Sequence, residues 1–221
     1  MEPSEHHLTV ARTARYYTLG ESGASLREVW FVLHGHGQLA YYFLRHFRPC
    51  SRHDRLIVAP EALSRFHLEP AVSHATGKPK VGATWMTRED RLAEIDDYVG
   101  YLDALHAEVF ARVDRAAAKV LVLGFSQGAT TACRWLCRGR VGADTLVLWA
   151  GTLPAELDAE SARPLRRTRM LRVLGGRDEL AGAGNVETET AHLRDLGLDA
   201  PLVRFDGGHE LSASVLAMLN A

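Results

Sequence analysis

The chain has few cysteines, no long apolar run and almost no net charge, and each shortage excludes a class of protein. Three cysteines among 221 residues are too few for a disulfide framework, so free or buried thiols are expected. No apolar run approaches the roughly 20 residues of a membrane-spanning helix. The 26 basic and 27 acidic residues leave a formal net charge of −1, which gives no electrostatic basis for binding nucleic acid or an anionic membrane.

The histidines and the amino-terminal residues narrow the expectation further. The chain has 11 histidines, but no His-x-x-x-His or Cys-x-x-Cys pattern is present. The first seven residues, Met-Glu-Pro-Ser-Glu-His-His, lack the basic and apolar character of a signal peptide. We therefore expect a cytoplasmic protein with no metal, no cofactor, no nucleic-acid partner and no stable membrane association. Its oligomeric state is left open, a homodimer included.

Short apolar segments alternate with helical ones along the chain. Strands are expected at 28–33, 56–59, 120–123, 145–150, 170–174 and 201–205, with one or two edge strands in 8–19. Helices are expected at 39–47, from Thr87 to about 113, after Ser126 to about 138, at 185–196 and at the carboxyl end. With no repeat and no inserted domain, this alternation predicts one α/β domain over residues 1–221. Its sheet should be mostly parallel, with helices on both faces.

One segment combines a buried strand, a tight turn and the start of a helix. The apolar strand at 120–123 is followed at once by Gly-Phe-Ser-Gln-Gly at 124–128 and then by helix-forming residues. This order is typical of a nucleophile elbow, in which a serine is held at the end of a sheet strand. The two glycines leave room for close backbone packing. Ser126 is therefore the expected nucleophile, and a plain glycine turn in a Rossmann-like unit is the alternative.

A second strand ends in His-Gly-His-Gly at 34–37. α/β-Hydrolases use a strand ending in His-Gly-x-Gly for part of the oxyanion hole, the set of N–H donors that stabilises negative charge on the substrate oxygen. On this interpretation the backbone N–H of His36 is one donor. The alternatives are a plain glycine turn or a metal site, although two histidines do not complete a metal site.

Two further strand ends supply an acid and a base. Asp178 and His209 each follow an apolar strand. A serine hydroxyl needs a base to take its proton, and an imidazole base needs an acid that fixes its tautomer and stabilises its charged form. The chain order Ser126, Asp178, His209 is the α/β-hydrolase order. Glu179 and Asp206 are the rival acids.

The segment 61–83 contains two prolines, two glycines and no sustained periodicity, which indicates a long loop. It follows a sheet strand, where ligand-contacting loops commonly lie. We expect Phe66 and His67, with Trp85 just beyond, to line a substrate pocket. A simple surface connection is the alternative.

Together these motifs resemble the phospholipase/carboxylesterase family of α/β-hydrolases, which includes acyl-protein thioesterases and small bacterial carboxylesterases. The matching pieces are Leu-His-Gly-His-Gly at 33–37, Gly-Phe-Ser-Gln-Gly-Ala at 124–129, Gly-Arg-Asp at 176–178 and Gly-Gly-His-Glu at 207–210. The resemblance implies an α/β-hydrolase fold without a large cap domain and a triad of Ser126, Asp178 and His209. It also implies an oxyanion hole made by the N–H groups of His36 and Gln127, and hydrolysis of esters or thioesters without a cofactor.

The expected function is that of a serine carboxylesterase, which cleaves small ester substrates through an acyl-enzyme on Ser126. A thioesterase or lysophospholipase is the nearest alternative, and a peptidase is a more distant one. A non-catalytic binding protein with the same fold belongs to a different class. Such proteins commonly lose a triad member, whereas all three residues are present in this sequence.

Overall fold

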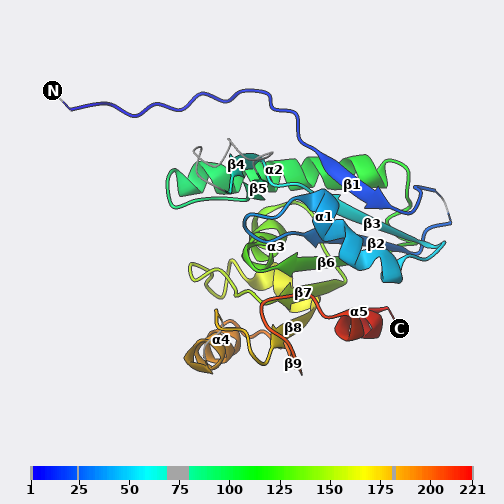
Figure 1. Cartoon of the computed structure of the whole chain (residues 1–221). Helices are drawn as coiled ribbons and strands as arrows, with labels where there is room; N and C mark the ends of the chain where they lie inside the picture. The colour runs from blue at the N-terminus through cyan, green and yellow to red at the C-terminus, as the bar shows by residue number, and fades with distance from the viewer. Residues whose placement is uncertain (1, 24, 69–79, 181–182, 221) are drawn as a thin grey trace.

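A seven-stranded sheet forms the centre of the structure, which is a computed structural model describing residues 2–23, 25–68, 80–180 and 183–220, without the side chains of 183–185 (Figure 1). The strand order is β1-β3-β2-β6-β7-β8-β9, and every neighbouring pair is parallel except β1 with β3. The strands are β1 (Tyr16–Leu19), β2 (Glu28–Leu33), β3 (Arg55–Pro60), β6 (Lys119–Phe125), β7 (Thr145–Trp149), β8 (Arg169–Gly175) and β9 (Leu202–Phe205).

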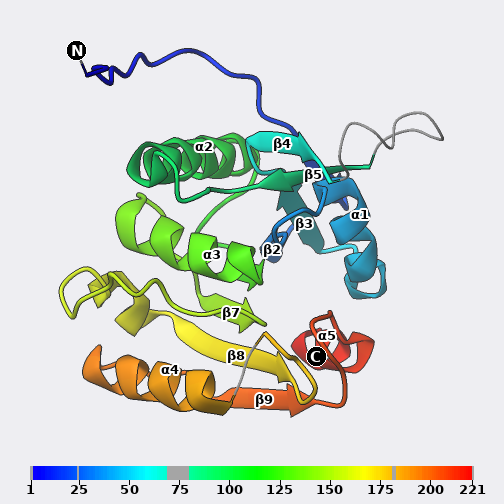
Figure 2. The same cartoon turned by 60° about the vertical axis from the view of Figure 1, so that its left-hand side comes forward.

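Helices cover both faces of this sheet (Figure 2). One face carries α2 (Arg91–Phe110), α3 (Gln127–Arg138) and α4 (Ala183–Asp195). The other carries α1 (Ala40–Leu44), the 3₁₀ helix Arg45–Cys50 and α5 (Ala213–Leu219). A second 3₁₀ helix, Arg163–Arg167, precedes β8.

The central strand β2 shows how one apolar run supplies two cores. Its residues Val29, Phe31 and Leu33 belong to the core beneath α2 and α3, whereas Trp30 and Val32 belong to the core beneath α1 and α5. Successive side chains of a strand point to opposite faces, so a strand covered on both sides is apolar throughout. The predicted fold class, a mostly parallel sheet with helices on both faces, is confirmed.

The expected loop at 61–83 contains a hairpin instead. β4 (Ser64–His67) pairs antiparallel with β5 (Val81–Thr84), and residues 69–79 between them lie outside the described part of the chain. Each strand has four residues, which is too short for a period-two pattern to stand out.

The start of the long helix also differs from the expectation. α2 begins at Arg91, and its N-cap is Asp90 with φ 43°, not Thr87. Thr87 lies outside the helix, where both its N–H and its hydroxyl bind Glu94 Oε2, at 2.6 and 3.1 Å. The helix expected at 39–47 is α-helical only from Ala40 to Leu44 and continues as the 3₁₀ helix, which contains Pro49. Within the described residues, no helix has both the length and the apolar character needed to cross a membrane.

Candidate active site

Ser126 lies at the turn between β6 and α3 with φ 54° and ψ −119°, a conformation that residues other than glycine seldom adopt. Its N–H donates to Trp149 O at 2.8 Å. A Cβ on Gly124 would lie 2.2 Å from Gly128 O, and one on Gly128 would lie 2.3 Å from Leu33 O. The turn therefore requires glycine at both positions. Strain of this kind at a single residue indicates a functional constraint.

Asp178 and His209 meet beyond the carboxyl ends of β8 and β9. His209 Nδ1 lies 2.8 Å from Asp178 Oδ2, and Asp178 Oδ1 accepts from the N–H of Leu180 at 3.0 Å. The Asp178 side chain is fully buried, whereas that of His209 is 27% exposed. Because an ionised carboxylate only accepts, the contact places a proton on His209 Nδ1 and leaves Nε2 as an acceptor.

His209 also packs against the elbow. Its ring centroid lies 5.0 Å from that of Phe125, the residue before Ser126. Among the described hydrogen bonds none joins Ser126 to His209. Catalytic hydrogen bonds are often long before substrate binds. The structure thus joins the predicted acid to the predicted base and places the base next to the residue that precedes the predicted nucleophile.

The two rival acids lie elsewhere. Glu179 is exposed, and Asp206 forms an ion pair with Arg177 on the surface. In the described part of the chain, neither is hydrogen-bonded to His209.

The loop after β2 lies against the elbow. A Cβ on Gly35 would lie 3.2 Å from the Cβ of the elbow serine. Gly35 N–H donates to Gln38 Oε1 at 2.7 Å, and Gly37 N–H donates to Ala83 O at 2.8 Å. Between them, His36 N–H has no partner among the described hydrogen bonds. The loop is therefore fixed by the N–H groups of Gly35 and Gly37, and the N–H of His36 between them is available to a ligand.

The other predicted donor is Gln127 N–H at the first residue of α3. A helix leaves its first N–H groups without intrahelical partners, and its amino end carries partial positive charge. Both features suit a site where negative charge develops on a substrate oxygen.

His34 is fully buried and both of its ring nitrogens are used within the fold. Nδ1 lies 2.8 Å from Gly35 O, and Nε2 accepts from the N–H of Ala62 at 3.1 Å. Burial lowers the pKa of His34 to about 4 despite the contact with Gly35. A neutral imidazole engaged in this way cannot also serve as a metal ligand through either nitrogen, which argues against the metal alternative for this loop.

The side chain of Gln127 binds the segment that follows β5, and sequence reasoning missed this contact. Oε1 accepts from Trp85 N–H at 3.0 Å, while Nε2 donates to Met86 O at 2.7 Å and to Thr84 Oγ1 at 3.0 Å. The indole N–H of Trp85 donates in turn to His34 O at 2.8 Å. Gln127 is thereby linked through Trp85 to the start of the loop at 34–37. No local pattern connects positions so far apart in the chain.

The three predicted pocket residues occupy different places. Phe66 on β4 stacks on the imidazole of His36 with 5.1 Å between ring centroids, and His67 is exposed on the same strand. Trp85 is only 2% exposed and packs in the core, where its ring lies 6.2 Å from that of Tyr98. Trp85 therefore supports the loop after β2 from behind instead of lining a pocket, because its large ring and its N–H both find partners inside the protein.

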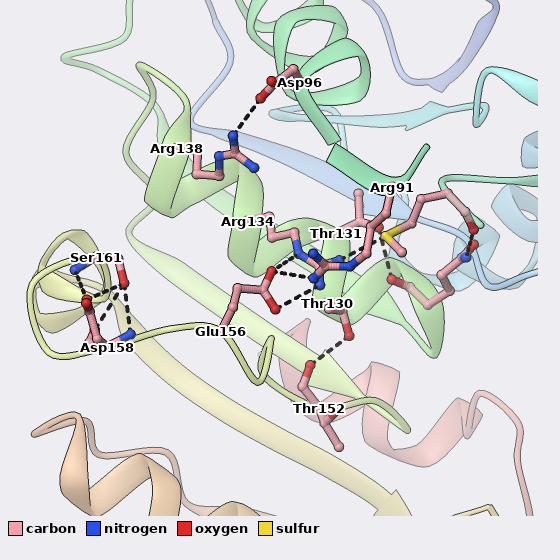
Figure 3. Close-up of polar contacts among 12 residues, drawn as sticks. Arg91, Asp96, Thr130, Thr131, Arg134, Arg138, Thr152, Glu156, Asp158 and Ser161 are labelled. Carbon is pink, nitrogen blue, oxygen red and sulfur yellow. Dashed lines mark hydrogen bonds and ion pairs between the residues drawn. The ribbon is translucent and has the colours of Figure 1, made fainter. Parts of the chain in front are cut away.

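An ion-pair network centred on Arg134 of α3 reaches the same segment (Figure 3). Buried Arg134 donates from Nε to Glu156 Oε1 at 2.7 Å, and Arg91 lies 2.8 Å from the same oxygen. Burial alone would raise the pKa of Glu156, but the hydrogen bonds from Arg134 lower it to about 2. Arg134 Nη1 also lies 3.3 Å from Met86 Sδ. The segment at 84–86 is thus held by α3 at two points.

Comparison with known proteins shows structural similarity only. No family model matches the chain, and no curated protein matches it in sequence. The crystal structure of esterase PE8 is 24% identical, with a TM-score of 0.67 over 95% of this chain and 97% of that one. Acyl-protein thioesterase 2 from Zea mays is 18% identical, with a TM-score of 0.69 over 94% and 96% of the two chains. A carboxylesterase from Mesorhizobium loti is 18% identical, with a TM-score of 0.68 over 94% and 92%.

These similarities cover nearly the whole chain, and the elements that they share are the parallel sheet and its flanking helices. The chain therefore has the α/β-hydrolase fold.

Proposed function

We propose that this protein is a serine hydrolase that cleaves carboxylic esters of small substrates through an acyl-enzyme on Ser126. The observation that carries the proposal is the 2.8 Å contact between Asp178 and His209, at the sheet edge where Ser126 occupies a strained turn. The similarity to esterases and a thioesterase in fold supports the same reaction class.

In the proposed mechanism, His209 Nε2 takes the hydroxyl proton of Ser126 as Oγ attacks the substrate carbonyl carbon. The carbonyl electron pair moves to oxygen, and the N–H groups of His36 and Gln127 donate to the resulting oxyanion. Asp178 holds the imidazole in place and stabilises its charged form. His209 then gives the proton to the departing alcohol as the carbon–oxygen bond breaks.

The second half of the cycle releases the acid. A water molecule attacks the acyl carbon while His209 takes one of its protons, and a second oxyanion forms at the same two donors. Ser126 Oγ leaves and recovers its proton from His209. Besides the substrate and water, these steps use only groups of the chain.

Labelling with a fluorophosphonate tests the proposal directly, because only an activated serine reacts. We expect one adduct per chain at Ser126, identified by peptide mass. Ser126→Ala should abolish labelling and lower kcat about 10⁴-fold on p-nitrophenyl butyrate, since the nucleophile is lost. The matched control is Ser161→Ala, at an exposed serine whose hydroxyl binds Asp158 in the segment between β7 and β8 (Figure 3). Full activity in Ser126→Ala would contradict the proposal.

Ester and thioester hydrolysis are separated by two substrates with the same acyl group. We expect butyryl esters to be cleaved with a higher kcat/KM than butyryl thioesters of matched leaving-group acidity. The reverse order would assign the protein to the thioesterase alternative while leaving the role of Ser126 intact.

A further inference from the structure

A small apolar cavity lies between the ends of β7 and β8 and the helix α4, next to the candidate active site. One wall is the chain after β7, at Ala150 and Gly151. Gly151 packs so closely on the elbow that a Cβ there would lie 2.4 Å from Ser126 O. The opposite wall includes Leu174 and Leu180, which flank the turn carrying Asp178. The cavity is therefore bounded by the loop after β7, which packs on the elbow, and by residues on either side of the predicted acid.

The cavity is small. It measures about 80 Å³ and is lined mainly by aliphatic side chains, including Leu148, Val186 and Leu202. A water-sized group occupies roughly 30 Å³ in a liquid, so there is room for about three atoms of a chain. A substrate part that enters must be short and mostly apolar.

Two opposite charges, Arg172 and Glu189, line the same cavity without forming an ion pair in the described part of the chain. Arg172 is only 9% exposed; its Nε donates to Ala200 O at 3.0 Å, and Nη1 and Nη2 both lie 3.2 Å from Thr190 Oγ1. A guanidinium has five N–H groups, so two have no protein partner among the described contacts. Glu189 Oε1 accepts from Leu153 N–H at 2.8 Å.

Buried N–H groups without a partner are costly, so a ligand group that accepts from the two free N–H groups of Arg172 and donates to Glu189 would be favoured. A carboxylate would be attracted by Arg172 but repelled by Glu189, and an ammonium group would meet the opposite combination. A hydroxyl group suits both, because its oxygen accepts from the guanidinium while its proton is donated to the carboxylate.

We infer that this cavity is the acyl subsite and that it selects a short acyl chain ending in a hydroxyl group. The inference rests on the proposed function, since it assigns the acyl part of a substrate bound to Ser126 to the cavity behind the Gly151 loop. The apolar walls hold the methylene groups, and Arg172 and Glu189 bind the terminal hydroxyl.

Three methyl esters test this selection: 4-hydroxybutanoate, pentanoate and succinate as its monoester. The first two have acyl groups with the same number of non-hydrogen atoms. They differ only at the end of the chain, which is a hydroxyl group in one and a methyl group in the other. Titration of released acid at constant pH counts hydrolysis only, because lactone formation releases no acid. We expect kcat/KM for the hydroxy ester to exceed that for the pentanoate by about tenfold or more, as hydrogen bonds to charged groups allow. The succinate should be the poorest substrate.

Arg172→Met should bring the hydroxy-to-methyl ratio to one or below. Glu189→Gln keeps the side-chain oxygen that accepts from Leu153 N–H and should lower the hydroxy-to-methyl ratio several-fold. The inference therefore remains testable even if Arg172→Met does not fold. The controls are Arg169→Met on the same strand and Glu187→Gln on the same helix, both exposed, and they should keep the wild-type ratio. A wild-type ratio of one or less, or an unchanged ratio in Arg172→Met, would overturn the inference.

A binding measurement keeps the two proposals separate. The Leu153 amide proton is donated to Glu189, so titration with butan-1-ol should shift its NMR resonance in a saturable way in the wild type and not in Arg172→Met. If the pentanoate is hydrolysed by Ser126 but the hydroxy ester is cleaved no faster, the subsite is rejected and the proposed function is not. Absence of all ester hydrolysis rejects the proposed function, and absence of the Leu153 shift rejects the subsite whether or not the protein is a hydrolase.

Discussion

At the scale of single residues, the candidate site uses backbone groups as well as side chains. His36 illustrates this, because its N–H is unpaired between two bonded glycine N–H groups while its ring stacks on Phe66. If His36 acts only through its N–H, its imidazole is dispensable for the reaction.

We expect His36→Ala to keep activity within about tenfold of the wild type. His36→Pro removes the donor and should lower kcat about 10²- to 10³-fold, the usual loss for one oxyanion donor. Steady-state kinetics with a circular-dichroism control for folding measure both effects. Equal losses in the two variants, together with inactivation by a chelator and recovery with zinc, would instead support a metal role for the imidazole.

His34 has the opposite character, because its ring is part of the interior. Its pKa is about 4 in the fold against an ordinary value of 6.5, as burial disfavours the charged form. Between these pH values the unfolded chain binds a proton that the folded chain does not. Stability from His34 is therefore fully present above pH 6.5 and falls as the pH decreases to about 4, by about 3 kcal/mol in all.

Urea unfolding at pH 7.5 and pH 4.5 tests this expectation. The free energy of unfolding of the wild type should be lower at pH 4.5 than at pH 7.5. In His34→Gln most of this decrease should be absent. Comparing the pH dependence of the two proteins cancels the contribution of other titrating groups. Parallel pH profiles would show that the pKa of His34 is the same in the folded and the unfolded protein, which would contradict this expectation.

At the scale of elements, the segment at 84–86 connects the elbow with the loop at 34–37. Gln127 binds it through three contacts, and Trp85 carries the connection to His34 O. In the proposed mechanism, Gln127 would therefore act as a positioning residue through its side chain, in addition to the donor role proposed for its N–H.

Gln127→Met keeps the length of the side chain and removes these hydrogen bonds. We expect kcat to fall about 10- to 100-fold with little change in KM, because the two oxyanion donors lose their relative placement while substrate contacts remain. Arg138→Met is the matched control, since Arg138 pairs with Asp96 near the far end of α3 (Figure 3). A wild-type kcat in Gln127→Met, or a loss confined to KM, would contradict this role.

The packing of β6 against α3 gives a second prediction at this scale. Gly124→Ala should destabilise the protein by about 2 kcal/mol or more, because its methyl group would lie 2.2 Å from Gly128 O. Gly100→Ala in α2 meets nothing within 4 Å and should stabilise by about 0.5–1 kcal/mol, as alanine favours a helix. Chemical denaturation measures both, and destabilisation by Gly100→Ala would refute the packing argument.

At the scale of the whole molecule, the sequence was sufficient for the sheet and most of its helices. Strands such as β2 and β6 are buried on both faces and therefore apolar throughout, which makes them visible. β4 and β5 were missed because four-residue strands derive their stability from each other and not from a local pattern. The start of α2 was misplaced because Thr87 binds Glu94 from outside the helix.

Within the candidate site, the sequence indicated the positions that follow strand ends. The proximity of Asp178 and His209 follows from the parallel register of β8 and β9. The contacts of Gln127 with 84–86 and the burial of Trp85 could not be inferred, because they depend on how the hairpin packs against α3. Likewise, Arg172 and Glu189 face one cavity only because α4 covers β8.

The position of β2 between β3 and β6 also constrains how the chain is made. Glu28 pairs with Lys119, so β2 leaves the ribosome long before its second neighbour exists. During that interval one edge of its Val-Trp-Phe-Val-Leu run has no strand to pair with, and such edges join other chains readily. A nascent chain arrested after residue 113 should therefore depend on a holding chaperone to stay unaggregated, and one arrested well past residue 138 should not.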